Sequence, residues 1–177
     1  NINIILEIGI LPEEAYGGNN TDGTIITSPP SYLKNLYGSN YTFTVQSSYS
    51  GIVLSAYSIP DTNACVISAI ATVCHYNSIS NIGSWTNYYN DVMHITDDVL
   101  GVFKWYGVMY SHIPTIIAQL FYYWGTQGWS YAYYSGASTV WSQGKNAIST
   151  AHPVVLAIDT SSSVYHNHAV VGYGWAV

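Results

Sequence analysis

The chain has 177 residues, of which three are Lys, none is Arg and nine are Asp or Glu, which gives 7% charged residues and a net charge of -6. A typical soluble domain carries about 25% charged residues. Three scattered cations argue against nucleic-acid binding, because neutralising phosphates needs clustered positive charge. The 18 Tyr and 6 Trp argue against disorder and supply enough apolar surface for a sizeable core.

The sequence predicts a protein without a transmembrane helix. Its two most apolar stretches, 99–110 and 113–124, have 12 residues each, whereas a spanning helix needs about 18. The chain begins at Asn1 and not at Met, which indicates a chain that is processed, trimmed or incomplete at the front and is compatible with a removed signal peptide. Surface polarity that comes from Ser, Thr, Asn and Tyr suits an acidic extracellular medium or a surface covered in an assembly. We therefore expect a secreted protein.

The first forty residues are predicted to be irregular, because clusters of Pro and Gly mark turns throughout them. Residues 1–40 are interpreted as an N-terminal extension or the remnant of a pro-segment, and residues 41–177 as the main domain. That domain opens with two alternating segments, 41–46 and 52–57, which predict strands.

A buried helix is predicted over 64–76, where small and apolar residues run without Gly or Pro after the candidate caps at 61–63. Cys65 and Cys74 lie nine residues apart on it, which corresponds to about 13 Å along a helix. A disulfide between them is excluded, because it needs Cα atoms within about 7 Å. Cys65 falls in the first turn, where free N–H groups and the helix dipole favour a thiolate. Cys74 is expected in the core.

The rest of the sequence predicts an α+β domain, with helices in front and strands behind. Residues 77–98 are polar and are interpreted as a loop, in which Asp97 and Asp98 form a solvated turn. Further helices are predicted over 111–124 and 138–150. Strands are predicted over 131–134, 153–158 and 168–173, and a Ser-rich loop joins the last two.

Two segments together resemble the papain-like cysteine peptidase superfamily, and within it the streptopain-like and the bacteriocin-leader-processing (double-glycine) peptidases. The first is Asn63-Ala-Cys-Val-Ile-Ser-Ala-Ile-Ala-Thr-Val, and the second is Pro153-Val-Val-Leu-Ala-Ile-Asp followed by His168-Ala-Val-Val-Gly-Tyr-Gly. In these enzymes a Cys opens a buried helix, and a Pro-Val strand then precedes a strand that begins with the catalytic His. The separation of 103 residues between Cys65 and His168 fits that pattern.

The resemblance implies a papain-like fold, in which the central helix with Cys65 packs on an antiparallel sheet. It assigns Cys65 as the nucleophile and His168 as the base that later protonates the leaving amine. Asn63 is the candidate side-chain donor of the oxyanion hole, because the Gln of the family is absent from its usual place before the Cys. The third residue of the family would fall after Val177. We therefore expect either a chain that continues or another group that orients His168, for which Asp159 is the candidate.

The resemblance implies a secreted cysteine peptidase that acts on a peptide or protein substrate without a cofactor. No metal site is expected, because the six His lack ligand spacing with other donors. An alternative is a catalytically degenerate protein of the same fold that serves as a structural or interaction subunit of an extracellular assembly, as a homo-oligomer or filament. The missing Gln, the unplaced third residue and the charge-poor surface motivate it. A third reading is a transglutaminase-like acyl transferase with the same Cys–His chemistry.

Overall fold

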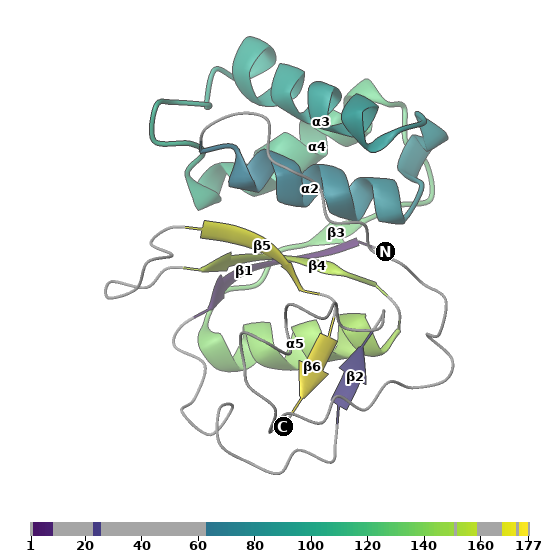
Figure 1. Cartoon of the computed structure of the whole chain (residues 1–177), viewed down its shortest axis with the longest axis vertical. Coiled ribbons are helices and arrows are strands. Elements are labelled where there is room, and N and C mark those ends of the chain that lie inside the picture. The colour runs from purple at the N-terminus through teal and green to yellow at the C-terminus, as the bar shows by residue number, and fades with distance from the viewer. Residues whose placement is uncertain are drawn as a thin grey trace, which may run out of the picture.

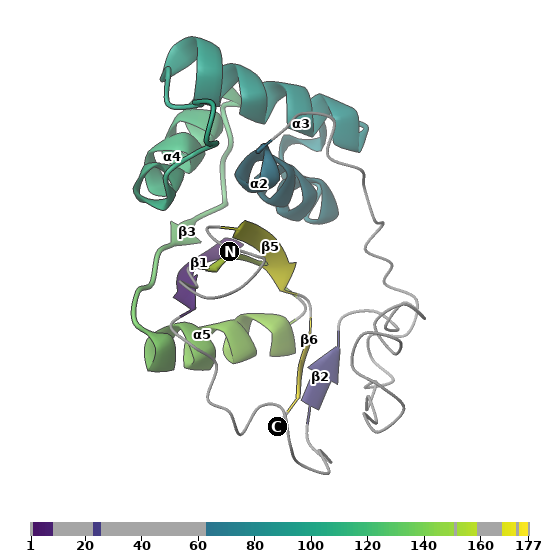
Figure 2. The same cartoon turned by 60° about the vertical axis from the view of Figure 1, so that its left-hand side comes forward.

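Helices cover both faces of a central sheet in the computed structural model, which describes residues 2–8, 23–25, 63–150, 152–158, 168–172 and 174–176. One face carries three helices, which are α2 (Cys65–Tyr76), α3 (Trp85–His94) and α4 (Ile113–Tyr123) (Figure 1). The other face carries α5 (Ala137–Ser149), as Figure 2 shows from a second side. The sheet has the strand order β3 (Tyr131–Ala132), β1 (Ile2–Ile8), β4 (Val154–Ile158) and β5 (His168–Gly172).

The central sheet is mixed. Strands β4 and β5 pair antiparallel, with Val154 opposite Gly172 and Ile158 opposite His168. Strand β1 lies between β3 and β4 and is parallel to both. The predicted α+β class is confirmed, but the expected antiparallel sheet is limited to the β4–β5 pair because the N-terminal strand enters the sheet in the parallel sense.

The N-terminal forty residues contain two strands, so the prediction that this region is irregular is wrong for 2–8 and 23–25. Strand β1 is a run rich in Ile, which suits a pleated sheet. Strand β2 (Gly23–Ile25) pairs antiparallel with β6 (Gly174–Ala176) in a small separate ribbon near α5 (Figure 2). The strands predicted over 41–46 and 52–57 lie outside the described residues, and the domain boundary at residue 41 stays a prediction.

Strand β4 divides the interior into two cores. Because successive side chains of a strand point to opposite faces, Val155 and Ala157 join the core under α2, α3 and α4. Val154 joins a second core with Val140 and Ile148 of α5. Full burial of one such side chain contributes roughly 1.5–3 kcal/mol, so both helical layers are held to the sheet through this strand.

Helix α2 forms as predicted and is buried along most of its length. It packs against α3 on one side and against β4 and β5 on the other. Its Ala residues at 69 and 71 are buried and small, which lets neighbouring elements approach closely. The other elements predicted after residue 110 are also found, since α4, β3, β4 and β5 fall within the expected ranges and α5 begins one residue before its range.

The prediction of a loop over 77–98 is wrong, because this segment forms α3 and then a π-helix over Ile95–Val99. The buried residues of α3 follow helical spacing and are Trp85, Tyr88, Tyr89 and Val92. They are mostly aromatic and are interspersed with Asn, Thr and Asp. The apolar face of the helix was therefore not recognised in the sequence.

Hydrogen bonds satisfy the polar groups of aromatic side chains on α3 and at the end of α4. The Tyr88 hydroxyl donates to the Ile79 carbonyl oxygen at 2.6 Å. The Trp124 indole N–H donates to an Asp91 carboxylate oxygen at 2.7 Å. Because buried polar groups without partners are costly, these bonds allow a chain with few charges to build its core from Tyr and Trp.

Candidate active site

Cys65 is the first residue of α2 and is partly exposed, at the edge of the main core. Ala64 is the N-cap, no side chain in the described part of the chain caps the helix by a hydrogen bond, and the first turn contains no acidic residue. The caps expected at 61–63 are therefore not found at Asn63, and Asp61 and Thr62 lie outside the described residues. The backbone N–H groups in the first turn of a helix carry partial positive charge, which favours an anion there.

Cys74 lies on the same helix in the opposite environment. Its side chain is buried, and burial raises the pKa of its thiol to about 12. Both cysteines are free, which confirms the predicted absence of a disulfide between them. The expected contrast between a core thiol and a partly exposed thiol at the helix start is found.

Strand β5 begins at His168 and packs against α2. In Figure 1, α2 lies beside β5 on one face of the sheet. The structure describes the backbone of His168, which pairs with Ile158. The His168 side chain and the whole of Asp159 lie outside what it describes, so the distances that a catalytic triad would require stay a prediction.

Asn63 links the start of α2 to a distant turn. Its backbone has a φ of 63°, a left-handed value that Asn tolerates better than most residues. Its side-chain Nδ2 donates a hydrogen bond of 2.7 Å to the carbonyl oxygen of Trp105. One of the two N–H bonds of the amide is thus used to hold a neighbouring segment, and the second N–H is what remains for the predicted oxyanion role.

The segment that Asn63 holds is a tight hairpin turn over residues 104–107, which we call the aromatic hairpin. Lys104 and Gly107 exchange two backbone hydrogen bonds, of 3.0 and 2.8 Å. Gly107 has a φ of 95°, and a Cβ at this position would lie 2.7 Å from the Asn63 carbonyl oxygen. Only glycine fits this close approach, so the turn is fixed against the residue that stands two before Cys65.

Two aromatic side chains at the tip of this hairpin face solvent. Trp105 is 87% exposed and Tyr106 is 52% exposed. Their rings pack edge to face with centroids 5.4 Å apart. The sequence gives no signal for this neighbour of Cys65, because the hairpin lies 42 residues further along the chain than Asn63.

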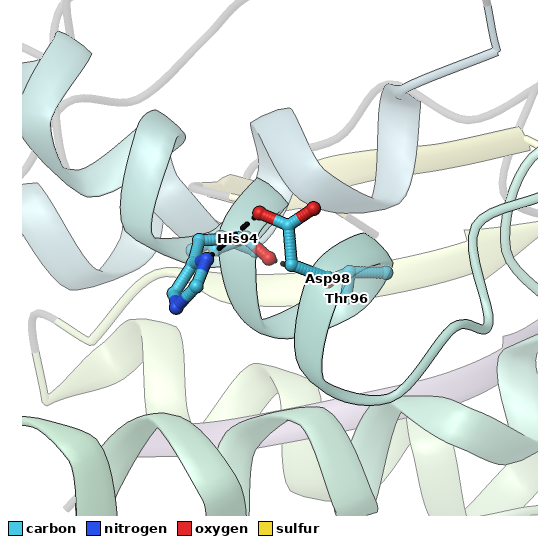
Figure 3. Close-up of polar contacts among 4 residues, drawn as sticks. His94, Thr96 and Asp98 are labelled. Atoms are coloured by element: carbon cyan, nitrogen blue, oxygen red, sulfur yellow. Dashed lines mark hydrogen bonds and ion pairs between the residues drawn. The ribbon is translucent and has the colours of Figure 1, made fainter.

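A second polar arrangement lies at the junction of α3 and the π-helix. His94 Nδ1 and Asp98 Oδ2 lie 2.8 Å apart, as Figure 3 shows, and the Thr96 hydroxyl donates to the Val92 carbonyl oxygen. The His94 and Asp98 side chains are 45% and 69% exposed, and such surface pairs contribute about 1 kcal/mol or less. The expected solvated turn at Asp98 is thus part of a helix with a local partner, which the i,i+4 spacing could have indicated.

No group of three or more metal-ligating side chains occurs in the described part of the chain. His152 lies near Thr150, and burial lowers the pKa of its imidazole. His75 packs edge to face against Tyr88. His75 lies in the last turn of α2 and His152 lies two residues before β4, so neither lies at the start of α2. A helix long and apolar enough to span a membrane is likewise not found in the described ranges.

Comparisons with protein-family models, with curated proteins and with solved structures find no match for this chain. A functional assignment therefore depends on the residues themselves. These are the partly exposed Cys65 at the start of a buried helix, the strand that His168 begins, and the aromatic hairpin held by Asn63.

Proposed function

We propose that the protein is a secreted papain-like cysteine peptidase, in which Cys65 and His168 hydrolyse peptide bonds. One observation carries the proposal: Cys65 is partly exposed at the first position of a buried helix, and that helix packs on the strand that begins with His168. A helix start favours a thiolate, and thiolate character is what makes a cysteine nucleophilic.

In the proposed reaction, the Cys65 thiolate adds to the substrate carbonyl carbon, and the oxyanion that forms is stabilised by backbone N–H groups at the start of α2. The protonated imidazole of His168 gives its proton to the leaving amine as the C–N bond breaks. Water then attacks the thioester with His168 as its base. This step releases the carboxylic acid and restores the thiol–imidazole pair.

The test compares the parent chain with three variants, under reducing conditions and at several pH values. Cleavage of a fluorescently labelled unfolded protein is expected for the parent and for Cys74→Ala, and is expected to be lost in Cys65→Ala and His168→Ala. Alkylation of Cys65 by iodoacetamide, followed by intact mass, should slow in His168→Ala. A parent protein whose Cys65 resists alkylation while folded contradicts the proposal.

A second candidate function is supported by the exposed aromatic side chains. Trp105 is 87% exposed and Tyr122 is 81% exposed, and large exposed apolar side chains are enriched at protein interfaces. In this alternative, the protein has a papain-like fold without catalytic activity and acts as a subunit of an extracellular assembly. It requires an oligomer or filament at low concentration, so light scattering that finds only monomer excludes it.

A further inference from the structure

The aromatic hairpin is rigidly placed beside the start of α2. Two contacts fix it there, namely the hydrogen bond from Asn63 to the Trp105 carbonyl oxygen and the close approach of Gly107 to the Asn63 backbone. Asn63 stands two residues before Cys65, and two residues span at most about 7 Å. The hairpin backbone is therefore a fixed neighbour of the thiol.

The rigid placement of the hairpin does not bury the side chains at its tip. Trp105 leaves 87% of its surface in water, although burial of a large apolar side chain is favourable. The edge-to-face contact with Tyr106 holds the two rings as one surface. A preorganised aromatic surface binds apolar groups with little loss of side-chain freedom.

The segment that contains the hairpin is nearly uncharged. Lys104 is the one charged residue in the stretch 99–112, which also contributes Phe103, Val108 and Met109. A bound carboxylate or phosphate would find a single cation here, whereas an apolar side chain would find two aromatic rings. The composition of the segment thus favours an apolar ligand.

We propose that the aromatic hairpin is the specificity-determining element of the Cys65 site, and that it takes an apolar or aromatic side chain of the peptide substrate. This inference rests on the proposed function, because that function supplies the peptide and the scissile bond. Since an extended peptide advances about 3.3 Å per residue, the recognised side chain lies within a few residues of the bond that is cut.

The first experiment measures binding without hydrolysis. The full chain carrying Cys65→Ala is titrated by calorimetry with two ten-residue Gly-Ser peptides, which have either Phe or Ser at one central position. Burial of the Phe ring predicts that the Phe peptide binds at least about tenfold more tightly. Adding Trp105→Ala should bring the two affinities together, whereas adding Tyr122→Ala, a matched exposed aromatic on α4, should leave the difference unchanged. Equal affinities in Cys65→Ala, or a difference that survives Trp105→Ala, overturn the inference.

The second experiment measures where the parent cuts. Mass spectrometry of the Phe peptide should give a cleavage site at a fixed spacing from the Phe, and Trp105→Ala should lose that preference while Cys65 keeps its alkylation rate. If the parent cuts no peptide but Trp105-dependent binding is present, the proposed hydrolysis fails and the recognition surface stands. If cleavage occurs with no dependence on Trp105, the hydrolysis stands and the inference about the hairpin fails.

Discussion

The two ends of helix α2 place the same chemical group in opposite environments. At its start, Cys65 is partly exposed beside an exposed aromatic hairpin, and no described side chain caps the helix. Near its end, Cys74 is buried, and the adjoining His75 and Tyr88 close that end with an aromatic contact. Both thiols stand on one continuous helix, so the difference between them arises from what packs against each position and not from the residue type.

This contrast explains how one helix can serve both stability and chemistry. Small and apolar residues bury most of α2 and fix its axis against β4 and β5. A helix held in this way places its first residue with little freedom, which is what a nucleophile needs. The buried end supplies the rigidity, and the exposed end is where a ligand can reach the thiol.

The largest expected effect is a difference in alkylation between the two thiols. Because the pKa of Cys74 is raised from 9.0 to about 12, its thiolate population near pH 8 is lower by about 1000-fold than that of an unperturbed thiol. Single variants, Cys65→Ala and Cys74→Ala, leave one thiol each for iodoacetamide labelling followed by intact mass. Cys65 should label in the folded protein and Cys74 only in urea, and equal native rates would abolish the contrast.

The buried end should also make the protein sensitive to alkali. Between pH 9 and 12 the unfolded chain releases the Cys74 proton while the folded chain keeps it, so stability falls as pH rises through this window. The effect reaches at most about 4 kcal/mol for the whole shift and about 1 kcal/mol at pH 10. Urea unfolding of the parent and of Cys74→Ala at pH 7.5 and pH 10 measures it. Parallel losses in the two proteins would show that Cys74 does not titrate as described.

A smaller effect on stability is expected from removing one buried hydroxyl group, compared with removing an exposed one. Tyr88→Phe deletes the 2.6 Å bond to the Ile79 carbonyl oxygen and should lower the free energy of unfolding by about 1–2 kcal/mol, because that oxygen is left without its donor. Tyr122→Phe is the matched control at an exposed site and should change little. Chemical denaturation compares them, and similar values for both variants would contradict the assignment.

The smallest effect is expected at the start of α2. Asn63→Gly keeps the left-handed backbone that position 63 requires but removes the bond to Trp105. Loss of this exposed bond should cost less than about 1 kcal/mol, with global unfolding nearly unchanged. Amide exchange at Gly107, whose N–H donates to Lys104, should accelerate by up to about fivefold as the hairpin loosens. Unchanged exchange would mean that the Gly107 contact alone holds the hairpin.

The sequence predicts the elements whose burial is carried by aliphatic runs. Helix α2 and strands β4 and β5 were predictable because small or β-branched residues continue without a break. Helix α3 was missed because its buried face is Trp and Tyr, which also occur on the surface of this chain. Strand β1 was missed because its partners in β3 and β4 lie at the other end of the sequence.

The candidate site was predictable only where it depends on the local sequence pattern. The place of Cys65 at the helix start follows from the local pattern, and so does the burial of Cys74. The contact between Asn63 and Trp105 depends on two left-handed residues, Asn63 and Gly107, and on a backbone approach between distant segments. Local periodicity contains no information of that kind, because the two segments meet only after the helices have packed.

The position of β1 sets the order in which this chain can fold during synthesis. Strand β1 is made before both of its partner strands, since Ile2 pairs with Tyr131 and Ile4 pairs with Val155. Helices α2, α3 and α4 contact one another within a short stretch of sequence and can associate early, whereas pairings of high sequence separation form slowly. One edge of β1 stays unpaired until β3 has been made and the other until β4 has been made, and unpaired strand edges are what chaperones protect against wrong association.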